Sequence, residues 1–494
     1  MTSGCVLALD QGTTGSTALV IAHDGRVLGR GYREITQCYP EPGQVEHDAN
    51  EILEKTVAAA REAMAMAGEQ PGAIGITNQR ETVVCWDKKT GEPVSNAIVW
   101  QDRRTSKRCA GLAGESAWIY ERTGLFPDPY FSSTKLELML KRDGEKSVLA
   151  RGDLLVGTMD TWLVWKLTGG AVHATDPTNA SRTMLFDIRS MAWSDELCDL
   201  FSIPRSLLPE VRPSSGDFGF ACAEFFGARI PITGVAGDQQ AALFGQGCWE
   251  AGETKNTYGT GAFLMANTGM ERPPLAEKNG LLTTIGCNAS GQPAYALEAA
   301  IFIAGAAVQW LRDGLGIIKT AKETEEMARS TDSNGGVYFV PALAGLGAPH
   351  WKPDARGTIV GLTGGTRREH IVRATLEAMA FSTSDVIHAM ADSSGEAIDK
   401  LRVDGGASAN DWLMQFQADV LGIPVERPEM IETTASGAAG LAGISSGFWS
   451  SAEDFLRTRR FRTFEPCKSS SAQDDLHSWR RAVRAAISWA DDVR

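Results

Sequence analysis

A carboxylate followed by a turn of glycine and hydroxyl residues stands near the start of the chain, in Asp10-Gln11-Gly12-Thr13-Thr14-Gly15-Ser16. The amides and hydroxyls of such a turn can bind phosphate oxygens, and Asp10 can hold Mg²⁺ through water. Taken alone, the same residues also fit an ordinary β-turn. A phosphate-binding role therefore depends on what the rest of the chain supplies.

Two further glycine turns occur in the second half of the chain, Gly259-Thr260-Gly261 and Asp404-Gly405-Gly406-Ala407. Because glycine has no side chain, a ligand can approach the backbone closely at such positions. All three turns follow short apolar segments typical of strands, and they are spread over both halves of the chain. This distribution predicts a nucleotide held between two domains.

The segments that position these turns alternate between strand-like and helix-like patterns. In the first half we expect strands at 6–9, 17–22, 26–31 and 73–77 and a helix at 50–67. In the second half we expect a strand–turn–strand unit at 252–267, helices at 299–313 and 370–390, a strand at 401–403, a helix beginning near Asn410 and a final helix from Leu476. The alternation indicates an α/β fold, and the recurring strand–turn–strand unit indicates two similarly built domains that meet near 245–255.

Length and composition narrow the class of protein. A chain of 494 residues is too long for one ordinary core, which predicts two domains. Its net charge of −13 argues against nucleic acid or an anionic membrane as a partner. The sequence has no apolar run of about 18 residues and no secretory signal, and its cysteines stand singly. We therefore expect a cytoplasmic protein that does not insert into membranes.

Longer runs of sequence carry more specific information. They are ALDQGTTGS at 8–16, GITNQRET at 75–82, NAIVWQDRR at 96–104, GTMDTWLVWKLTGG at 157–170, TDPTNASRTMLF at 175–186, GVAGDQQAALFGQ at 234–246, KNTYGTGAF at 255–263 and LRVDGGASANDWLMQFQ at 401–417. Together they closely resemble the glycerol kinases of the FGGY family of carbohydrate kinases, from Ala8 to about Trp449. The resemblance implies two ribonuclease-H-like (actin-like ATPase) domains, residues 1–248 and 249–494, flanking a catalytic cleft.

The resemblance also implies a reaction, ATP-dependent phosphorylation of glycerol to sn-glycerol 3-phosphate, with Asp238 as the general base. It assigns the glycerol site to Arg80, Glu81, Trp100, Tyr130, Asp238, Gln239 and Phe263. It assigns the ATP site to Thr13, Thr14, Gly15, Ser16, Gly259, Thr260, Gly305, Gln309, Gly406 and Asn410, and Mg²⁺ to Asp10 and Asp238. An Arg–Glu pair suits a polyol because one residue donates hydrogen bonds and the other accepts them.

Two positions depart from the family pattern. Thr17 stands where many relatives have Arg, and Gly15 replaces a residue with a hydroxyl group. Loss of a cation near the phosphates is expected to weaken ATP binding or slow transfer. The alternatives are a kinase for another small polyol or ketose, such as erythritol or xylulose, and a non-catalytic ATP-binding regulator. The resemblance also implies a homo-oligomer, either a dimer or a tetramer.

Overall fold

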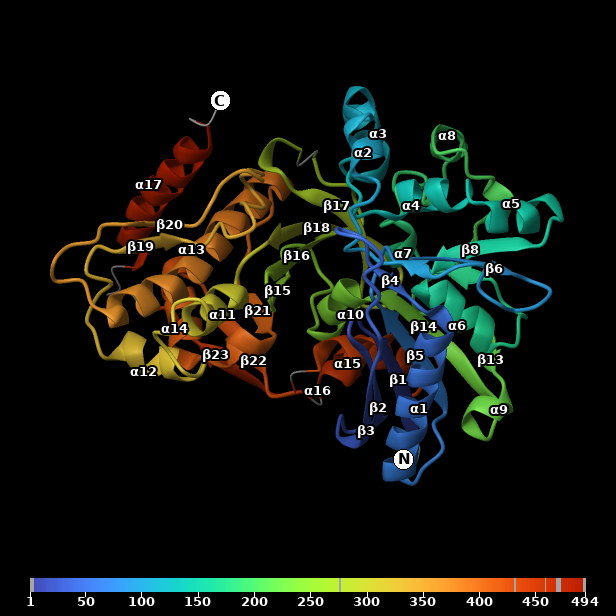
Figure 1. The fold of residues 1–494 in the computed structure, drawn as a ribbon. Coiled ribbons are helices and arrows are strands. Elements are labelled where there is room, and N and C mark those ends of the chain that lie inside the picture. The colour runs from blue at the N-terminus through green and yellow to red at the C-terminus, as the bar shows by residue number, and fades with distance from the viewer. Residues whose placement is uncertain (1–3, 275–276, 431, 458, 468–471, 492–494) are drawn as a thin grey trace.

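The computed structural model describes residues 4–274, 277–430, 432–457, 459–467 and 472–491. Figure 1 shows two α/β halves side by side, one blue to green and the other yellow to red. Each half is built around one large sheet. In the part of the chain that the structure describes, we find no helix with the length and apolar character needed to cross a bilayer.

The first sheet brings three strand ends to one edge. Its order is β13-β14-β5-β1-β2-β3, with bounds Phe220–Ala221, Ile230–Gly237, Ala73–Asn78, Cys5–Gln11, Gly15–Ala22 and Val27–Glu34. Strands β1, β5 and β14 are parallel neighbours, and Thr77 of β5 is in register with Asp10 of β1 and Ala236 of β14. Their carboxyl ends therefore lie at the same edge of the sheet. Asp10 lies at the end of β1, and Arg80 and Asp238 follow shortly after the ends of β5 and β14.

The second sheet repeats the plan of the first. Its order is β17-β18-β16-β15-β21-β22-β23, with bounds Leu282–Cys287, Pro293–Ile301, Ala262–Gly269, Thr254–Tyr258, Leu401–Asp404, Val425–Pro428 and Phe461–Phe464. Antiparallel strands lead into parallel ones in both sheets, β3-β2-β1 into β5-β14 and β18-β16-β15 into β21-β22. This repetition confirms the expected α/β fold of two actin-like ATPase-type domains.

A smaller subdomain is formed mainly by the chain between β5 and β14, and its strand β4 comes from before β5. Its four-stranded sheet has the order β4-β7-β6-β8, with bounds Glu46–His47, Ala97–Ile98, Val83–Asp87 and Leu154–Thr158. The helices in this stretch of the chain are α2 Ser106–Ala110, α3 Ser116–Thr123, α4 Ser132–Met139, α5 Asp143–Ala150, α6 Met159–Leu167, α7 Pro177–Ala180, α8 Asp195–Leu200 and α9 Ala223–Phe226. Short strand pairs complete the chain: β9 Ala174–Thr175 with β12 Glu210–Val211, β10 Phe186–Asp187 with β11 Ala192–Trp193, and β19 Tyr338–Val340 with β20 Thr358–Val360.

The helices expected from the sequence form, although two of them begin elsewhere than expected. They are α1 Ala49–Ala67, α11 Gly305–Asp313, α13 Arg368–Ser394, α14 Asp411–Leu421 and α17 Ala472–Asp491, and two further helices, α10 Asp238–Gly245 and α12 Glu323–Arg329, were not expected. The helix expected over 299–313 is wrong at its start, because Ala300 and Ile301 still pair with β16 as part of β18. Helix α17 begins four residues before Leu476, where the apolar stripe was expected to start it.

Helix α15 (Thr433–Ser445) belongs to the second half in sequence but packs on the first sheet, against β1, β5, β14 and α10 (Figure 1). A single apolar cluster joins Val6, Leu19 and Ile21 of that sheet to Leu441 of α15 and to Phe455 of α16 (Ala452–Arg457). The predicted division at residue 248 therefore leaves α15 on the face of the other half, and that boundary stays a prediction.

Glycines let α15 approach the sheet backbone. A Cβ on Gly75 would overlap the carbonyl oxygen of Ala438, and one on Gly437 would overlap that of Ala241. The small side chains along TTASGAAGLAGIS leave the helix with little bulk to hold it away. Helix α15 thus meets both strand β5 and helix α10 backbone to backbone.

We expect Gly75→Ala to destabilise the protein by about 1–3 kcal/mol, because the added methyl group forces α15 away from β5. The measurement is the free energy of unfolding in urea. Gly114→Ala is the matched control, since its added Cβ meets no atom within 4 Å. Equal stability of the two variants would contradict the close approach of α15.

Candidate functional site

Hydrogen bonds within the turn between β1 and β2, and to neighbouring residues, hold the turn in place. Gly12 N donates to Gly15 O at 2.9 Å, and the Trp100 indole donates to Thr13 Oγ1 at 2.9 Å. The Ser16 hydroxyl is buried and bonds Thr56 Oγ1 of α1 at 2.8 Å. The hydroxyl groups of Thr13 and Thr14 thus belong to the turn itself, whereas that of Ser16 is engaged beneath it.

Asp10 and Asp238 are close enough for their charges to interact. Burial, with the charge of Asp238 as a second cause, raises the pKa of Asp10 to about 7. The side chain of Asp238 is 31% exposed, yet burial raises its pKa as well, against the attraction of Arg80. Two carboxylates that repel one another in this way would be stabilised by a cation between them.

Arg80 anchors Asp238 within the site. Its Nε lies 3.1 Å from Asp238 Oδ1, and its Nη1 donates to Glu298 Oε2 at 2.6 Å and to Gln240 Oε1 at 3.2 Å. Its Nη2 donates to the Tyr130 hydroxyl at a longer 3.4 Å. The guanidinium is 2% exposed, so these contacts fix its position and that of the carboxylate beside it.

A second buried arginine completes this cluster. Arg182 Nε donates to Glu81 Oε1 at 2.6 Å, and its Nη2 lies 3.0 Å from Glu298 Oε1. Although burial opposes it, attraction to Arg182 and Arg80 lowers the pKa of Glu298 to about 2. Glu81 has φ 62°, a left-handed backbone that costs of order 1–3 kcal/mol in a non-glycine residue. The charge cluster is what holds that conformation.

Aromatic rings lie beside the cluster. Trp100 and Tyr130 meet edge to face with centroids 5.5 Å apart, and Arg182 lies over the rings of Tyr130 and Phe131 at 5.4 and 5.1 Å. Phe263 comes from the other half, opposite Thr257 in the β15–β16 hairpin. The structure therefore brings Arg80, Glu81, Trp100, Tyr130 and Asp238 together, with Phe263 carried by the second sheet.

Gln239 connects the two halves. It follows Asp238 in α10, and its side-chain oxygen accepts a hydrogen bond from Lys255 Nζ of β15. Lys255 is buried, and it also donates to Thr257 Oγ1 at 2.8 Å. Sequence reasoning assigned Gln239 to the site but gave no role to Lys255, although it lies within the run KNTYGTGAF.

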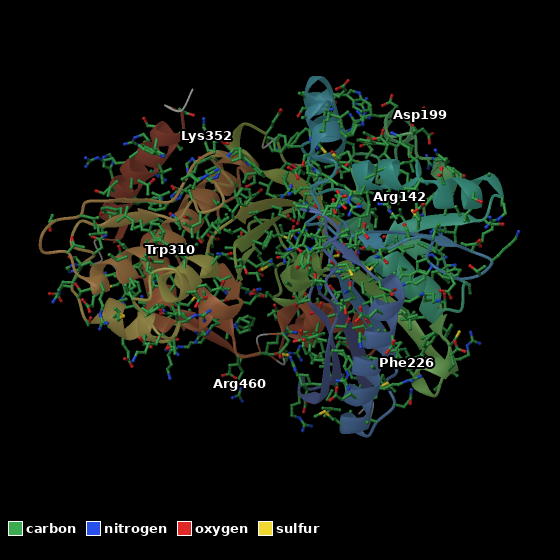
Figure 2. All side chains as sticks on the ribbon, viewed as in Figure 1. Arg142, Asp199, Phe226, Trp310, Lys352 and Arg460 are labelled. Atoms are coloured by element: carbon green, nitrogen blue, oxygen red, sulfur yellow. The ribbon has the colours of Figure 1, made fainter. Side chains whose placement is uncertain are left out.

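One cavity of about 610 Å³ is lined by the ATP-site residues expected in the C-terminal half, whereas Thr13, Thr14, Gly15 and Ser16 are not in its lining. Its lining includes Gly259, Thr260, Gly305, Gln309, Gly406 and Asn410. The Asn410 side chain caps α14 by accepting from Leu413 N at 2.9 Å, and Gly305 opens α11. Trp310, labelled in Figure 2, packs on Phe339 with centroids 5.3 Å apart and so holds α11 against β19.

Arg182 and Glu298 were missed by sequence reasoning. Arg182 lies in the run TDPTNASRTMLF, but nothing local distinguishes it from a surface arginine. Glu298 lies in β18, next to the segment that was expected to be helical. Its bond to Arg80 joins residues 218 positions apart, and no local pattern encodes such a contact.

Comparison with known proteins gives a consistent result. The FGGY family of carbohydrate kinases matches in two parts, its N-terminal domain over residues 5–245 and its C-terminal domain over residues 254–446. Glycerol kinase 2 of Thermotoga maritima is 53% identical over 98% of this chain and 99% of its own, and a glycerol kinase of Halorhodospira halophila is 55% identical over 98% and 97%. The crystal structure of Plasmodium falciparum glycerol kinase with ADP superposes with a TM-score of 0.92, at 35% identity over 98% of both chains.

Proposed function

The chain belongs to the FGGY family of carbohydrate kinases, and from that premise we propose that it phosphorylates glycerol with ATP to give sn-glycerol 3-phosphate. The observation that carries this proposal is the Arg80–Asp238 contact of 3.1 Å at the shared edge of β5 and β14. It occurs in a chain that matches glycerol kinases over 98% of its length. The reaction needs a base beside a bound hydroxyl group, and this pair supplies one.

In this mechanism Asp238 takes the proton of the terminal hydroxyl group as the oxygen attacks the γ-phosphorus. A carboxylate whose pKa is raised by burial is a stronger base than a solvated one, and Arg80 holds it in place. The other glycerol hydroxyl groups bind Arg80 and Glu81, with Tyr130 and Gln239 as further partners. Trp100 and Phe263 pack against the carbon chain.

ATP occupies the cavity of the C-terminal half, with its phosphates directed toward the turns at Thr13, Thr14 and Gly15 and at Gly259 and Thr260. The cavity volume and the glycine residues that line it support this placement. Movement of the second sheet and the helices packed on it toward the first sheet would exclude water from the transfer. Ser16 contributes its backbone, because its hydroxyl group is bonded to Thr56.

Asp10 and Asp238 are the residues that would hold Mg²⁺. Their mutual repulsion, which contributes to raising the pKa of Asp10 to about 7, fits a site completed by a cation. Among the described residues, no three His, Cys, Asp or Glu side chains gather into a metal cage. That fits Mg²⁺, which takes most of its ligands from water and phosphate. When bound, it supplies positive charge next to the phosphate oxygens.

We expect purified protein with Mg-ATP to release ADP rapidly when glycerol is added and slowly without it. Chelation of the metal should stop the reaction. Erythritol and xylulose are the comparison substrates, and a preference for either would replace glycerol in the proposal. Tight ATP binding without ADP release in the presence of any of these polyols would instead favour the non-catalytic regulator.

The remaining parts of the proposal concern the setting of the enzyme. We place it in the cytoplasm as a homo-oligomer, a dimer or a tetramer. The absence of a membrane-spanning helix among the described residues is compatible with that location. Light scattering of the purified protein measures its oligomeric state.

A further inference from the structure

Lys255 is a buried cation at the junction of the two halves. It lies in β15, between Met265 of β16 and Arg402 of β21, and its side chain is fully shielded from solvent. Its Nζ bonds Gln239, the neighbour of Asp238, and Thr257. An ammonium group has three N–H donors, and the described residues accept two of them.

Carboxylates face Lys255 from both halves. Burial lowers its pKa, whereas the charges of Asp404 and Asp238 oppose that change, and Arg80 and Glu298 act on it more weakly. Asp404 ends β21, directly before the Gly405-Gly406 turn of the nucleotide cavity. Its Oδ2 accepts from Gln246 and Thr433, but its buried Oδ1 has no hydrogen-bond partner among the described residues.

Lys255 therefore lies between Asp238, the proposed base, and Asp404, the residue before the Gly405-Gly406 turn. Positive charge is otherwise scarce there, since the first phosphate loop, residues 10–17, contains neither lysine nor arginine. Arg80 already contacts Glu298, Gln240 and Asp238, and its remaining donors are assigned to glycerol. A transferring phosphoryl group carries negative charge that a fixed donor stabilises.

We propose that Lys255 is a catalytic residue whose third N–H, shielded from solvent in this structure, is donated to the phosphoryl group when the two halves close for transfer. This inference rests on the proposed kinase function. In the step, a bond forms between the glycerol oxygen and the γ-phosphorus, and the bond from that phosphorus to the bridging oxygen of ADP breaks. The hydroxyl proton goes to Asp238, and Lys255 keeps its own proton throughout.

The first test measures binding, which does not depend on the acceptor. Calorimetry with Mg²⁺ compares ADP with a non-transferable ATP analogue. Lys255→Met should weaken binding of the analogue by about tenfold or more, because it removes one charged hydrogen bond. Binding of ADP should weaken far less. An unchanged ratio of the two affinities would overturn the proposal, even if glycerol proved to be the wrong substrate.

The second test measures turnover. Lys255→Met should lower kcat by about 100-fold, whereas Lys255→Arg keeps the charge and should recover part of it. Thr257→Val removes one partner of Lys255 and retains its charge, so it should lose much less. Lys255→Gln keeps a hydrogen-bond donor but not the charge. It is used in place of Lys255→Met if Lys255→Met unfolds at a lower temperature than the wild-type protein. A kcat of Lys255→Gln near the wild-type value would refute the role, whereas failure of wild-type protein to use glycerol bears only on the proposed substrate.

Discussion

Asp238→Asn is expected to lower kcat for glycerol-dependent ADP release by about 10²- to 10⁴-fold. The amide cannot accept the hydroxyl proton, although it retains the size of the carboxylate. ATP binding should change less, because the nucleotide cavity lies mainly in the other half. Steady-state kinetics over a range of glycerol and ATP concentrations separate these effects.

Two controls sharpen that experiment. Asp199→Asn makes the same chemical change at an exposed position in α8, labelled in Figure 2, and should leave kcat unaltered. Thermal unfolding of Asp238→Asn should show a folded protein, although its contact with Arg80 is weakened. A variant that is folded and fully active would exclude Asp238 as the base.

Removing Glu298 should have the largest effect on stability. Glu298→Ala leaves the guanidinium groups of Arg80 and Arg182 buried without their shared carboxylate. An uncompensated buried charge of this kind costs about 3–5 kcal/mol. The free energy of unfolding in urea measures the loss, and activity should fall with it because Arg80 no longer has a fixed position.

The matched comparison is Glu121→Ala, which breaks a pair with Arg189 in which the glutamate is 52% exposed. Exposed pairs contribute about 0–1 kcal/mol, so this variant should remain close to wild-type stability. Glu298→Gln should fall between the two, since it keeps an acceptor but no charge. If Glu298→Ala were as stable as Glu121→Ala, the cluster would not be what holds Glu81 in its left-handed backbone conformation.

Much of this architecture could be predicted from local sequence. The apolar segments before Asp10 and Gly405 identify strands, and the glycines after them identify turns that a ligand can approach. The resemblance to the FGGY family then assigned Arg80 and Asp238, which the structure brings within 3.1 Å. Both the strand-and-turn pattern and the family motifs lie in short segments of the chain.

What escaped prediction depends on contacts across the fold. Ala299–Ile301 was assigned to a helix because its composition suits either element, and pairing with β16 decides for a strand. The role of Glu298 arises only when β18 brings it to two arginines from the other half. The hydroxyl of Ser16 likewise turns away from the phosphate loop because Thr56 of α1 accepts it.

The packing of α15 also affects synthesis of the chain. The strand that completes the first sheet, β14, ends at Gly237, yet the helix that covers one face of that sheet ends at Ser445. A ribosome that adds 5–20 residues per second needs roughly 10–40 s to cross that interval. During this time Val6, Leu19 and Ile21 lack their final cover, so the nascent N-terminal half is a natural client for chaperones until translation is nearly complete.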